Sequence, residues 1–399
     1  MNKNIIFCAD GTWNTPNQDD DKDGLPDFTN VWRLYGDIEG SAVAVNPDLT
    51  DEYQKALTDA GGSMIQVAHY IHGVGDSRNW LLRMLGGIFG AGTICHIVRG
   101  YLFVSRHYAP GDRIYLNGFS RGAYTARALA GMIAKCGLLN PATVNFDDEA
   151  SACSRAVAAW IRYRQQSGTP QPLVARILEQ LPQLFHRPID DADLLPDVPV
   201  EAVAVWETVG ALGIPRYASE RRLDVYQFAD TKLSEQVRFG RQAIAIDEER
   251  LDFTPTCWCQ RDGIVQAQFA GIHSDVGGGY PSAGDGNGLS NISYRWLRDE
   301  LIALGVKIKQ VARPEDPFGG IHCEWGGGKP WLTSPRVLPS PVSPGMMLHR
   351  SAATRLESTR PAPVMQPGGA WRNQLYRPLA LKSFTAPDWQ LPPETVFAE

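Results

Sequence analysis

Residues 116–124 read Leu-Asn-Gly-Phe-Ser-Arg-Gly-Ala-Tyr, and they contain the pattern Gly-x-Ser-x-Gly with Ser120 at its centre. The apolar run 113–116 before them is typical of a strand, and the run 125–132 after them is typical of a helix. A serine nucleophile of the elbow type lies on such a strand-to-helix turn, where the flanking residues are small and helix N–H groups face an oxyanion. The stretch therefore predicts an α/β fold with Ser120 as the nucleophile, and an ordinary glycine-bracketed turn is the alternative.

The rest of the chain alternates between short apolar runs and longer helical patterns, which is how a parallel sheet with crossover helices is encoded. The predicted strands are 4–9, 66–71, 113–117, 200–206 and 266–272. The predicted helices are 29–37, 93–107, 124–136 and 290–304. We therefore expect an α/β-hydrolase-like fold, with a mainly parallel sheet and helices on both of its faces.

The domain organisation follows from where this alternation stops. Residues 1–304 carry it and are expected to form an α/β-hydrolase catalytic domain. Within that domain, 139–199 is longer than a single crossover needs, and its helical patterns at 149–165 and 172–185 predict a helical cap insertion. Prolines and glycines are frequent in 305–399, which is expected to be a C-terminal extension, without long helices, that packs on the core.

Composition excludes several functions. The 44 Asp and Glu outnumber the 38 Lys and Arg, giving a formal net charge of −6, so nucleic acid is not an expected partner. The seven cysteines are scattered and match neither a disulfide framework nor zinc spacing. The acidic stretch 19–24 opens like a calcium loop, but Asn30 stands where that loop needs a glutamate, so we expect a solvated loop and no metal or cofactor.

The N-terminal apolar run 5–9 is too short for a signal peptide. We therefore expect synthesis in the cytoplasm without such a signal, and any export would use another route.

A serine nucleophile requires a base that a third group orients. His273 ends an apolar run and opens a glycine-rich loop, so it is the predicted base. Glu207, which also follows an apolar run, is the predicted acid. Asp247 follows a similar run and is the competing acid, although its charged neighbours are typical of a solvated corner, and Asp275 is expected to have a supporting role.

The first predicted strand ends in Asp10-Gly11-Thr12. In elbow hydrolases a loop after an early strand supplies one oxyanion N–H, and the residue after the nucleophile supplies another. Those donors would be Gly11 or Thr12, together with Arg121. Asp10 either anchors this loop through backbone N–H groups or supports the site directly.

Six motifs together resemble one known family, the bacterial α/β-hydrolase domain of type VI secretion phospholipase effectors of the first lipase class. They are Asp10–Asn14, Thr29–Val31, Gly73–Gly75, Gly118–Arg127, Val205–Gly210 and Gly271–Tyr280. The resemblance implies hydrolysis of phospholipid acyl esters by a Ser-acid-His triad, carried over to Ser120, Glu207 and His273. The chain has Glu207 where that family usually has aspartate.

The resemblance also sets the expected partners. They are a lipid or ester substrate, a transient membrane surface, and a type VI secretion apparatus or immunity partner. Two other functions fit the residues: an esterase or amidase for soluble substrates, and a hydrolase-like scaffold that binds a partner through the proline-rich extension.

Overall fold

The computed structural model of the chain describes most of the sequence. The described residues are 2–11, 14–17, 19, 22, 24, 26–44, 52–73, 91–166, 188–209, 232–281, 287–328, 331–341 and 345–399. Thr12 and the predicted cap helix 172–185 lie outside them, as do Asp20, Asp21 and Asp23 of the acidic stretch 19–24. Two compact units make up the chain. Unit 1 comprises Met1–Trp13, Glu39–Val203 and Leu223–Phe239, and unit 2 comprises Asn14–Ile38, Ala204–Arg222 and Gly240–Glu399.

Unit 1 is built on strands in the order β5, β1, β4, β3, β2. Their bounds are β1 Asn4–Ala9, β2 Ser41–Val43, β3 Glu52–Thr58, β4 Met64–Ile71 and β5 Arg113–Phe119. β1 runs parallel to β4 and β5, whereas β3 is antiparallel to both of its neighbours. All six residues of β1 are buried, as expected for a strand that is covered on both faces.

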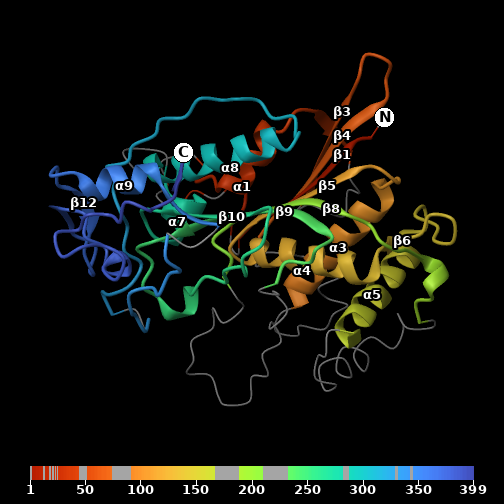
Figure 1. The fold of residues 1–399 in the computed structure, drawn as a ribbon. Helices are drawn as coiled ribbons and strands as arrows, with labels where there is room; N and C mark the ends of the chain where they lie inside the picture. Colours follow the sequence, from red (N-terminus) through yellow and green to blue (C-terminus); the bar gives the residue numbers. More distant parts are fainter. Residues whose placement is uncertain are drawn as a thin grey trace. The chain divides into compact units, whose positions relative to one another are not determined.

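Each helix described in unit 1 comes directly after a strand in the order of described elements. These helices are α3 Ala91–His107, α4 Arg121–Cys136 and α5 Glu149–Gln166. α3 and α4 both contact β1, and Figure 1 shows them together with α5 below the strands of this unit. The short strands β6 Leu138–Leu139 and β7 Leu194–Leu195 pair after α4, with the 3-10 turn η2 Asp191–Asp193 beside them.

Unit 2 is built on strands in the order β14, β11, β10, β9, and each neighbouring pair among them is parallel. Their bounds are β9 Val237–Ala245, β10 Ile264–Phe269, β11 Met346–His349 and β14 Phe397–Ala398. β8 Val200–Trp206 and β9 each have residues in both units. Unit 1 thus has a mixed sheet and unit 2 a parallel one, each with helices, and the predicted α/β class is confirmed.

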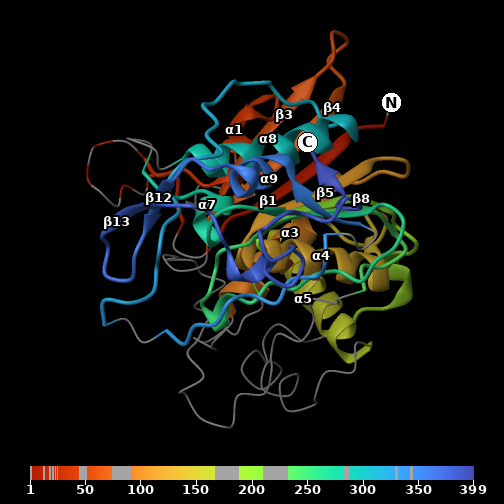
Figure 2. The same cartoon turned by 60° about the vertical axis from the view of Figure 1, so that its left-hand side comes forward.

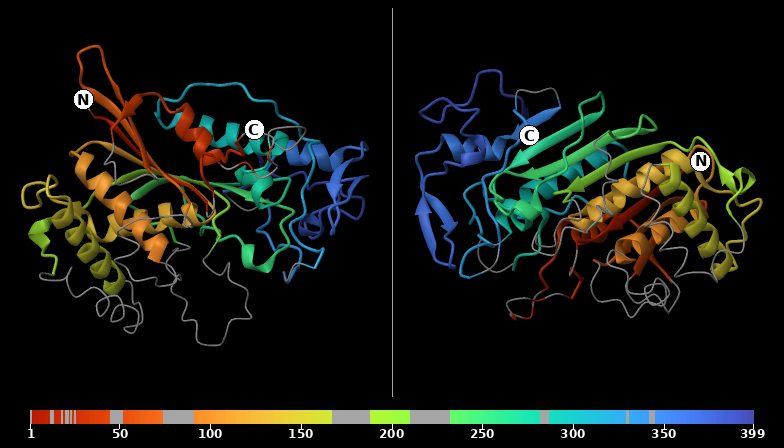
Figure 3. Two further views of the ribbon diagram at one scale, coloured as in Figure 1. Left: turned by 180° about the vertical axis from the view of Figure 1, so that it is seen from behind. Right: turned by 90° about the horizontal axis from the view of Figure 1, so that it is seen from below.

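The helices of unit 2 are α1 Asn30–Asp37, α7 His273–Gly277, α8 Gly288–Ala303 and α9 Arg350–Glu357. α1 packs along α8, as Figures 1 and 3 show. The polar contact between them centres on Arg33, whose guanidinium donates to Asn287 at 2.6 Å and to Asn291 at 3.1 Å. The buried Asn30 reaches the same helix through the carbonyl of Ser290 at 3.0 Å.

Residues 305–399 contribute strands and core side chains to unit 2. β11 and β14 lie in this region, and Leu348, Leu356 and Leu381 are buried in one apolar cluster with Ile244 and Ile272. The remaining elements here are the antiparallel pair β12 Ala362–Met365 and β13 Trp371–Gln374, seen in Figure 2, and the 3-10 turn η4 Leu379–Leu381. A further 3-10 turn, η3 Leu251–Phe253, follows β9.

Candidate active site

Ser120 occupies the turn between β5 and α4. Its backbone has φ 57° and ψ −118°, a left-handed conformation that is strained for a residue with a side chain. A Cβ atom at Gly118 would overlap the carbonyl of Gly122, and one at Gly122 would overlap the carbonyl oxygen of Ala9. Both glycines of the pattern are therefore required by close backbone packing, and this is the geometry of a nucleophile elbow.

Asp10 lies directly after β1, and the register of β1 on β5 sets Ala9 opposite Gly118. The Asp10 carboxylate is buried and accepts the Gly11 N–H at 2.7 Å and the Tyr70 hydroxyl at 2.6 Å. Burial and the neighbouring Asp10 raise the pKa of the Tyr70 hydroxyl well above its usual value. The bond from the Gly11 backbone N–H is the kind of contact that the anchoring role of Asp10 requires.

The predicted oxyanion donors are placed in part. Arg121 is the first residue of α4. At this end of a helix the backbone N–H groups have no carbonyl of the same helix to bond. The Gly11 N–H is directed at the Asp10 carboxylate, and Thr12 lies outside the described residues.

Glu207 and His273 form a hydrogen-bonded pair in unit 2. Glu207 follows β8, His273 opens α7, and Nδ1 of the imidazole lies 3.0 Å from Oε2 of the carboxylate. Glu207 is 0% exposed and His273 is 4% exposed. Since a carboxylate only accepts, Nδ1 carries the proton and Nε2 is left as the basic nitrogen.

Other groups hold the Glu207 carboxylate in place. Oε1 accepts the Ala245 N–H at 2.7 Å, and the Arg336 guanidinium donates to Oε1 at 2.9 Å and to Oε2 at 2.8 Å. Burial alone would raise the pKa of Glu207, but the charge of Arg336, together with the hydrogen bonds from His273 and Arg336, lowers it to about 2. Glu207 is therefore ionised at neutral pH.

His273 is held on its other sides by Glu248 and Phe253. Its backbone N–H donates to Glu248 at 3.3 Å, and the Phe253 ring meets the imidazole edge-on at 4.9 Å between centroids. Arg250 in turn donates to both oxygens of Glu248 at 2.8 Å. Burial lowers the pKa of His273, and the neighbouring Glu207 opposes that shift. A neutral imidazole at neutral pH is what a general base requires.

Asp247, the competing acid, is bonded elsewhere. Its Oδ2 accepts the Gly271 N–H at 2.7 Å and the Tyr376 hydroxyl at 2.9 Å. Burial raises the pKa of Asp247 to about 7. Of the two candidate acids, Glu207 is the one whose carboxylate bonds the imidazole of His273.

Asp275 also holds a histidine, but a different one. Its Oδ1 lies 2.6 Å from Nδ1 of His322, and its Oδ2 accepts the backbone N–H of Ile272 at 3.0 Å. The His322 ring stacks on Tyr280, with 3.7 Å between ring centroids. Asp275 thus supports the turn that presents His273, and its side chain orients His322.

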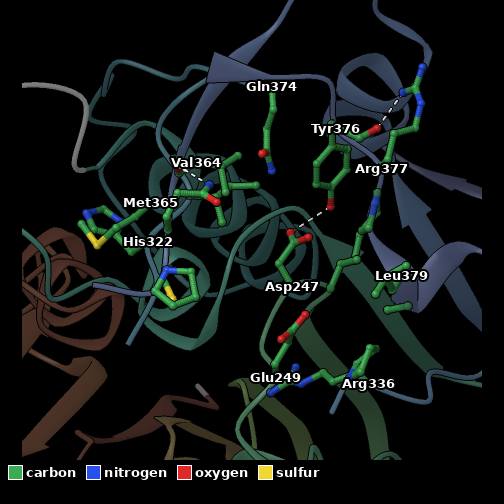
Figure 4. Close-up of a pocket in the computed structure, with 18 of the residues that line it drawn as sticks. Asp247, Glu249, His322, Arg336, Val364, Met365, Gln374, Tyr376, Arg377 and Leu379 are labelled. Atoms are coloured by element: carbon green, nitrogen blue, oxygen red, sulfur yellow. Dashed lines mark hydrogen bonds between the residues drawn. The ribbon is translucent and has the colours of Figure 1, made fainter. Parts of the chain in front are cut away.

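Asp247 and His322 line a cavity of about 310 Å³ in unit 2. Figure 4 shows the Asp247 carboxyl pointing to the Tyr376 hydroxyl, with Glu249 and Gln374 also on the wall. Burial raises the pKa of Glu249 as well.

Sequence reasoning did not select Arg336 or His322 as site residues. Both come from the proline-rich extension, and Arg336 is separated from Glu207 by 129 positions. Neither residue follows an apolar run, so no local pattern pointed to them.

The comparisons with known proteins identify a family. The family model described as "T6SS, Phospholipase effector Tle1-like, catalytic domain" matches residues 3–300. Among curated proteins, the chain is 29% identical over 264 residues to the uncharacterized protein YEL023C of Saccharomyces cerevisiae, a match that covers 64% of this chain and 33% of that protein.

Two solved structures are also similar. A crystal structure of an uncharacterized protein from Pseudomonas aeruginosa has a TM-score of 0.39 at 17% identity, covering 77% of this chain and 46% of that one. The structure of the Tle1 effector bound to the VgrG spike from the Type 6 secretion system has a TM-score of 0.36 at 16% identity, covering 71% of this chain and 52% of that one. The chain therefore spans about a third of the yeast protein and about half of each structural neighbour.

Among the residues that the structure describes, no helix combines the length and the apolar character needed to cross a membrane. The family match covers well over half of the 399 residues and agrees with the resemblance seen in the sequence motifs. The chain belongs to the family of Tle1-like catalytic domains of T6SS phospholipase effectors.

Proposed function

We propose that the protein is a serine hydrolase that cleaves the acyl ester bonds of phospholipids, with Ser120 as nucleophile, His273 as general base and Glu207 as the triad acid. The observation that carries the proposal is the buried hydrogen bond between Glu207 and Nδ1 of His273, which leaves Nε2 as the basic nitrogen. The elbow conformation of Ser120 supports it from unit 1, and family membership supports the lipid substrate.

The reaction proceeds through an acyl-enzyme. Ser120 Oγ attacks the ester carbonyl carbon while Nε2 of His273 takes the hydroxyl proton. The tetrahedral intermediate collapses with cleavage of the carbon–oxygen bond, and the imidazolium returns the proton to the leaving alcohol. Water then repeats the two steps on the acyl-enzyme, which releases the fatty acid and restores Ser120.

The negative charge of the tetrahedral intermediate requires hydrogen-bond donors. The backbone N–H of Arg121, at the first position of α4, is one proposed donor, and Gly11 or Thr12 supplies the second. Since the Gly11 N–H bonds Asp10, Gly11 acts as a donor only if that bond is exchanged when substrate binds.

The proposed setting is bacterial type VI secretion. Family membership supports export through that apparatus. The proposed partners are the secretion apparatus and an immunity protein. The target would be the phospholipids of a membrane surface, which the protein would contact transiently.

A fluorophosphonate probe and phospholipid vesicles test the function together. We expect the probe to label the protein, and the protein to release fatty acid from the vesicles. Ser120→Ala should abolish both the labelling and the release. Turnover of short soluble esters with no activity on vesicles would indicate an esterase instead. A folded wild-type protein that neither reacts with the probe nor hydrolyses any ester would reject the proposal and favour a binding scaffold.

A further inference from the structure

Arg336 comes from the extension, beyond the last residue that the family model matches. Its side chain is 4% exposed and meets Glu207 with both terminal nitrogens, at 2.9 Å and 2.8 Å. The same nitrogens donate to the carbonyl oxygens of Ala245 and Phe253, each at 2.6 Å. Arg336 is thus bonded both to the proposed triad acid and to the backbone around it.

The planar fork of an arginine fixes the plane of the carboxylate that it binds. Oε2 of Glu207 receives both Arg336 and Nδ1 of His273, while Oε1 receives Arg336 and the Ala245 N–H. Rotation of the carboxylate would break at least two of these bonds at once. The bonds therefore hold Oε2 where it meets the imidazole.

Arg336 also sets the charge of the pair. Burial pushes Glu207 towards its neutral form, and the Arg336 cation is the largest of the influences that keep it ionised. With Arg336 present, Glu207 and neutral His273 make a cluster of zero net charge, so a further proton on His273 adds a buried positive charge. Without Arg336 the same proton would neutralise the cluster, so the imidazole would become more basic.

We propose that Arg336 is a positioning residue of the active site, which holds Glu207 ionised and oriented towards His273. This inference rests on the proposed triad. It makes the extension part of the catalytic apparatus, and it accounts for how a glutamate, one methylene longer than aspartate, is kept in register with the imidazole. A purely structural Arg336, which only ties the extension to the backbone at 245 and 253, is the competing explanation.

The pH dependence of kcat/KM separates the two explanations. The acidic limb of this profile reflects protonation of His273. In full-length Arg336→Gln we expect it to shift to higher pH by about one unit, because the imidazole becomes more basic. We also expect the plateau to fall by about 100-fold, because the carboxylate is no longer fixed. Arg336→Lys keeps the positive charge but lacks the planar guanidinium that binds both carboxylate oxygens. The acidic limb of its pH profile should therefore stay near that of the wild type, while the maximal kcat/KM falls.

Arg355→Gln is the matched control. Arg355 is a buried arginine of the same extension, and its guanidinium donates to the carbonyls of Pro317 and Gly319 at 3.0 Å and 2.6 Å. Its replacement should lower the midpoint of thermal unfolding without moving the limb. If folded Arg336→Gln has the wild-type limb, or Arg355→Gln moves it equally, the positioning role is overturned.

A second comparison applies even if Arg336→Gln does not fold. In a Glu207→Gln background, Arg336→Lys should cause no further loss of kcat/KM, because the carboxylate that it positions is gone. Fully additive losses would overturn the proposal.

Ser120→Ala separates failure of this inference from failure of the proposed function. If Ser120→Ala keeps full turnover, the triad and the role of Arg336 are both rejected. If Ser120→Ala is inactive while the Arg336 variants keep the wild-type profile, the positioning role alone is rejected.

Discussion

Nδ1 of His273 and Oε2 of Glu207 lie 3.0 Å apart, with both side chains almost completely removed from solvent. The glutamate that provides this oxygen has a positive φ of 49°, and Ser120 is also left-handed, at 57°. Two proposed catalytic residues thus hold strained backbone conformations at the ends of strands. Strain of this kind persists where the surroundings over-determine it, which is common in active sites.

The two candidate acids can be separated by amide substitution. Glu207→Gln should lower kcat/KM by about 10³-fold or more, because an amide favours the wrong imidazole tautomer and no longer stabilises the imidazolium. Asp247→Asn should change kcat/KM little, since its carboxyl bonds Gly271 and Tyr376. Steady-state kinetics on one ester substrate measures both, and an equal loss in Asp247→Asn would contradict the assignment.

Ser120→Gly should raise the free energy of unfolding by about 1 kcal/mol while it abolishes reaction with the fluorophosphonate probe. Glycine adopts φ 57° without strain, whereas alanine does not. Ser120→Ala is therefore the matched control, equally unreactive but without the gain. Urea unfolding measures the difference, and equal stability of the two variants would show that the turn stores no strain.

Gly122→Ala should lower the free energy of unfolding by about 3 kcal/mol or prevent folding, because the added methyl group overlaps the Ala9 carbonyl. Gly36 is the matched control: it lies within α1, and a Cβ there meets no atom within 4 Å. Gly36→Ala should stabilise the protein by about 0.5–1 kcal/mol. Thermal and urea unfolding check both, and a neutral Gly122→Ala would contradict the close packing at the elbow.

The pH dependence of the free energy of unfolding should reveal the titration of the Asp247 carboxyl group. Its pKa is raised from 3.8 to about 7 in the folded protein, so between these values the folded state binds more proton than the unfolded state. The contribution of Asp247 is therefore fully present below about pH 4 and is lost as the pH rises through 7, at no more than about 1.4 kcal/mol per pH unit.

Asp247→Asn removes this titration. The variant should gain stability relative to the wild type as the pH is raised from 5 to 8, as measured by urea unfolding at each pH. A wild-type minus variant difference that does not change with pH would show that Asp247 is not protonated in the folded state.

Helices α1, α3, α4, α5 and α8 could be predicted because their apolar faces repeat along the sequence, whereas the short helices α7 and α9 were not predicted. The predicted helix 29–37 is α1, and the predicted helix 93–107 is α3 to within two residues at its start. The strands that carry continuous apolar runs, such as β1 and β8, were equally clear. A helix or strand that is buried along its whole length leaves a regular pattern of apolar residues, and this pattern can be recognised in a single sequence.

Other strands could not be predicted because they lack such runs. β9 begins Val-Arg-Phe-Gly-Arg, with exposed and half-buried positions before its apolar end. β11 and β14 are four and two residues long and lie among prolines. β11 takes its place in the sheet by pairing with β10, and β14 by pairing with β11, rather than through their own composition.

The same distinction applies to the site. Glu207 and His273 each follow a strand, and strand ends on one edge of a parallel sheet are brought together by the fold, so their proximity followed from position. Arg336 lies in the irregular segment Ser-Pro-Arg-Val-Leu-Pro, where its partner is set only by the folded path of the chain.

The pairing of β11 with β10 has a practical consequence for recombinant work. A fragment truncated at residue 300, the limit of the family match, would lose β11 and leave the buried edge of β10 without its hydrogen-bonding neighbour. Unprotected sheet edges recruit other chains and aggregate. Expression plasmids for this protein should therefore retain the coding sequence through β14, and we expect a clone that ends at residue 300 to aggregate.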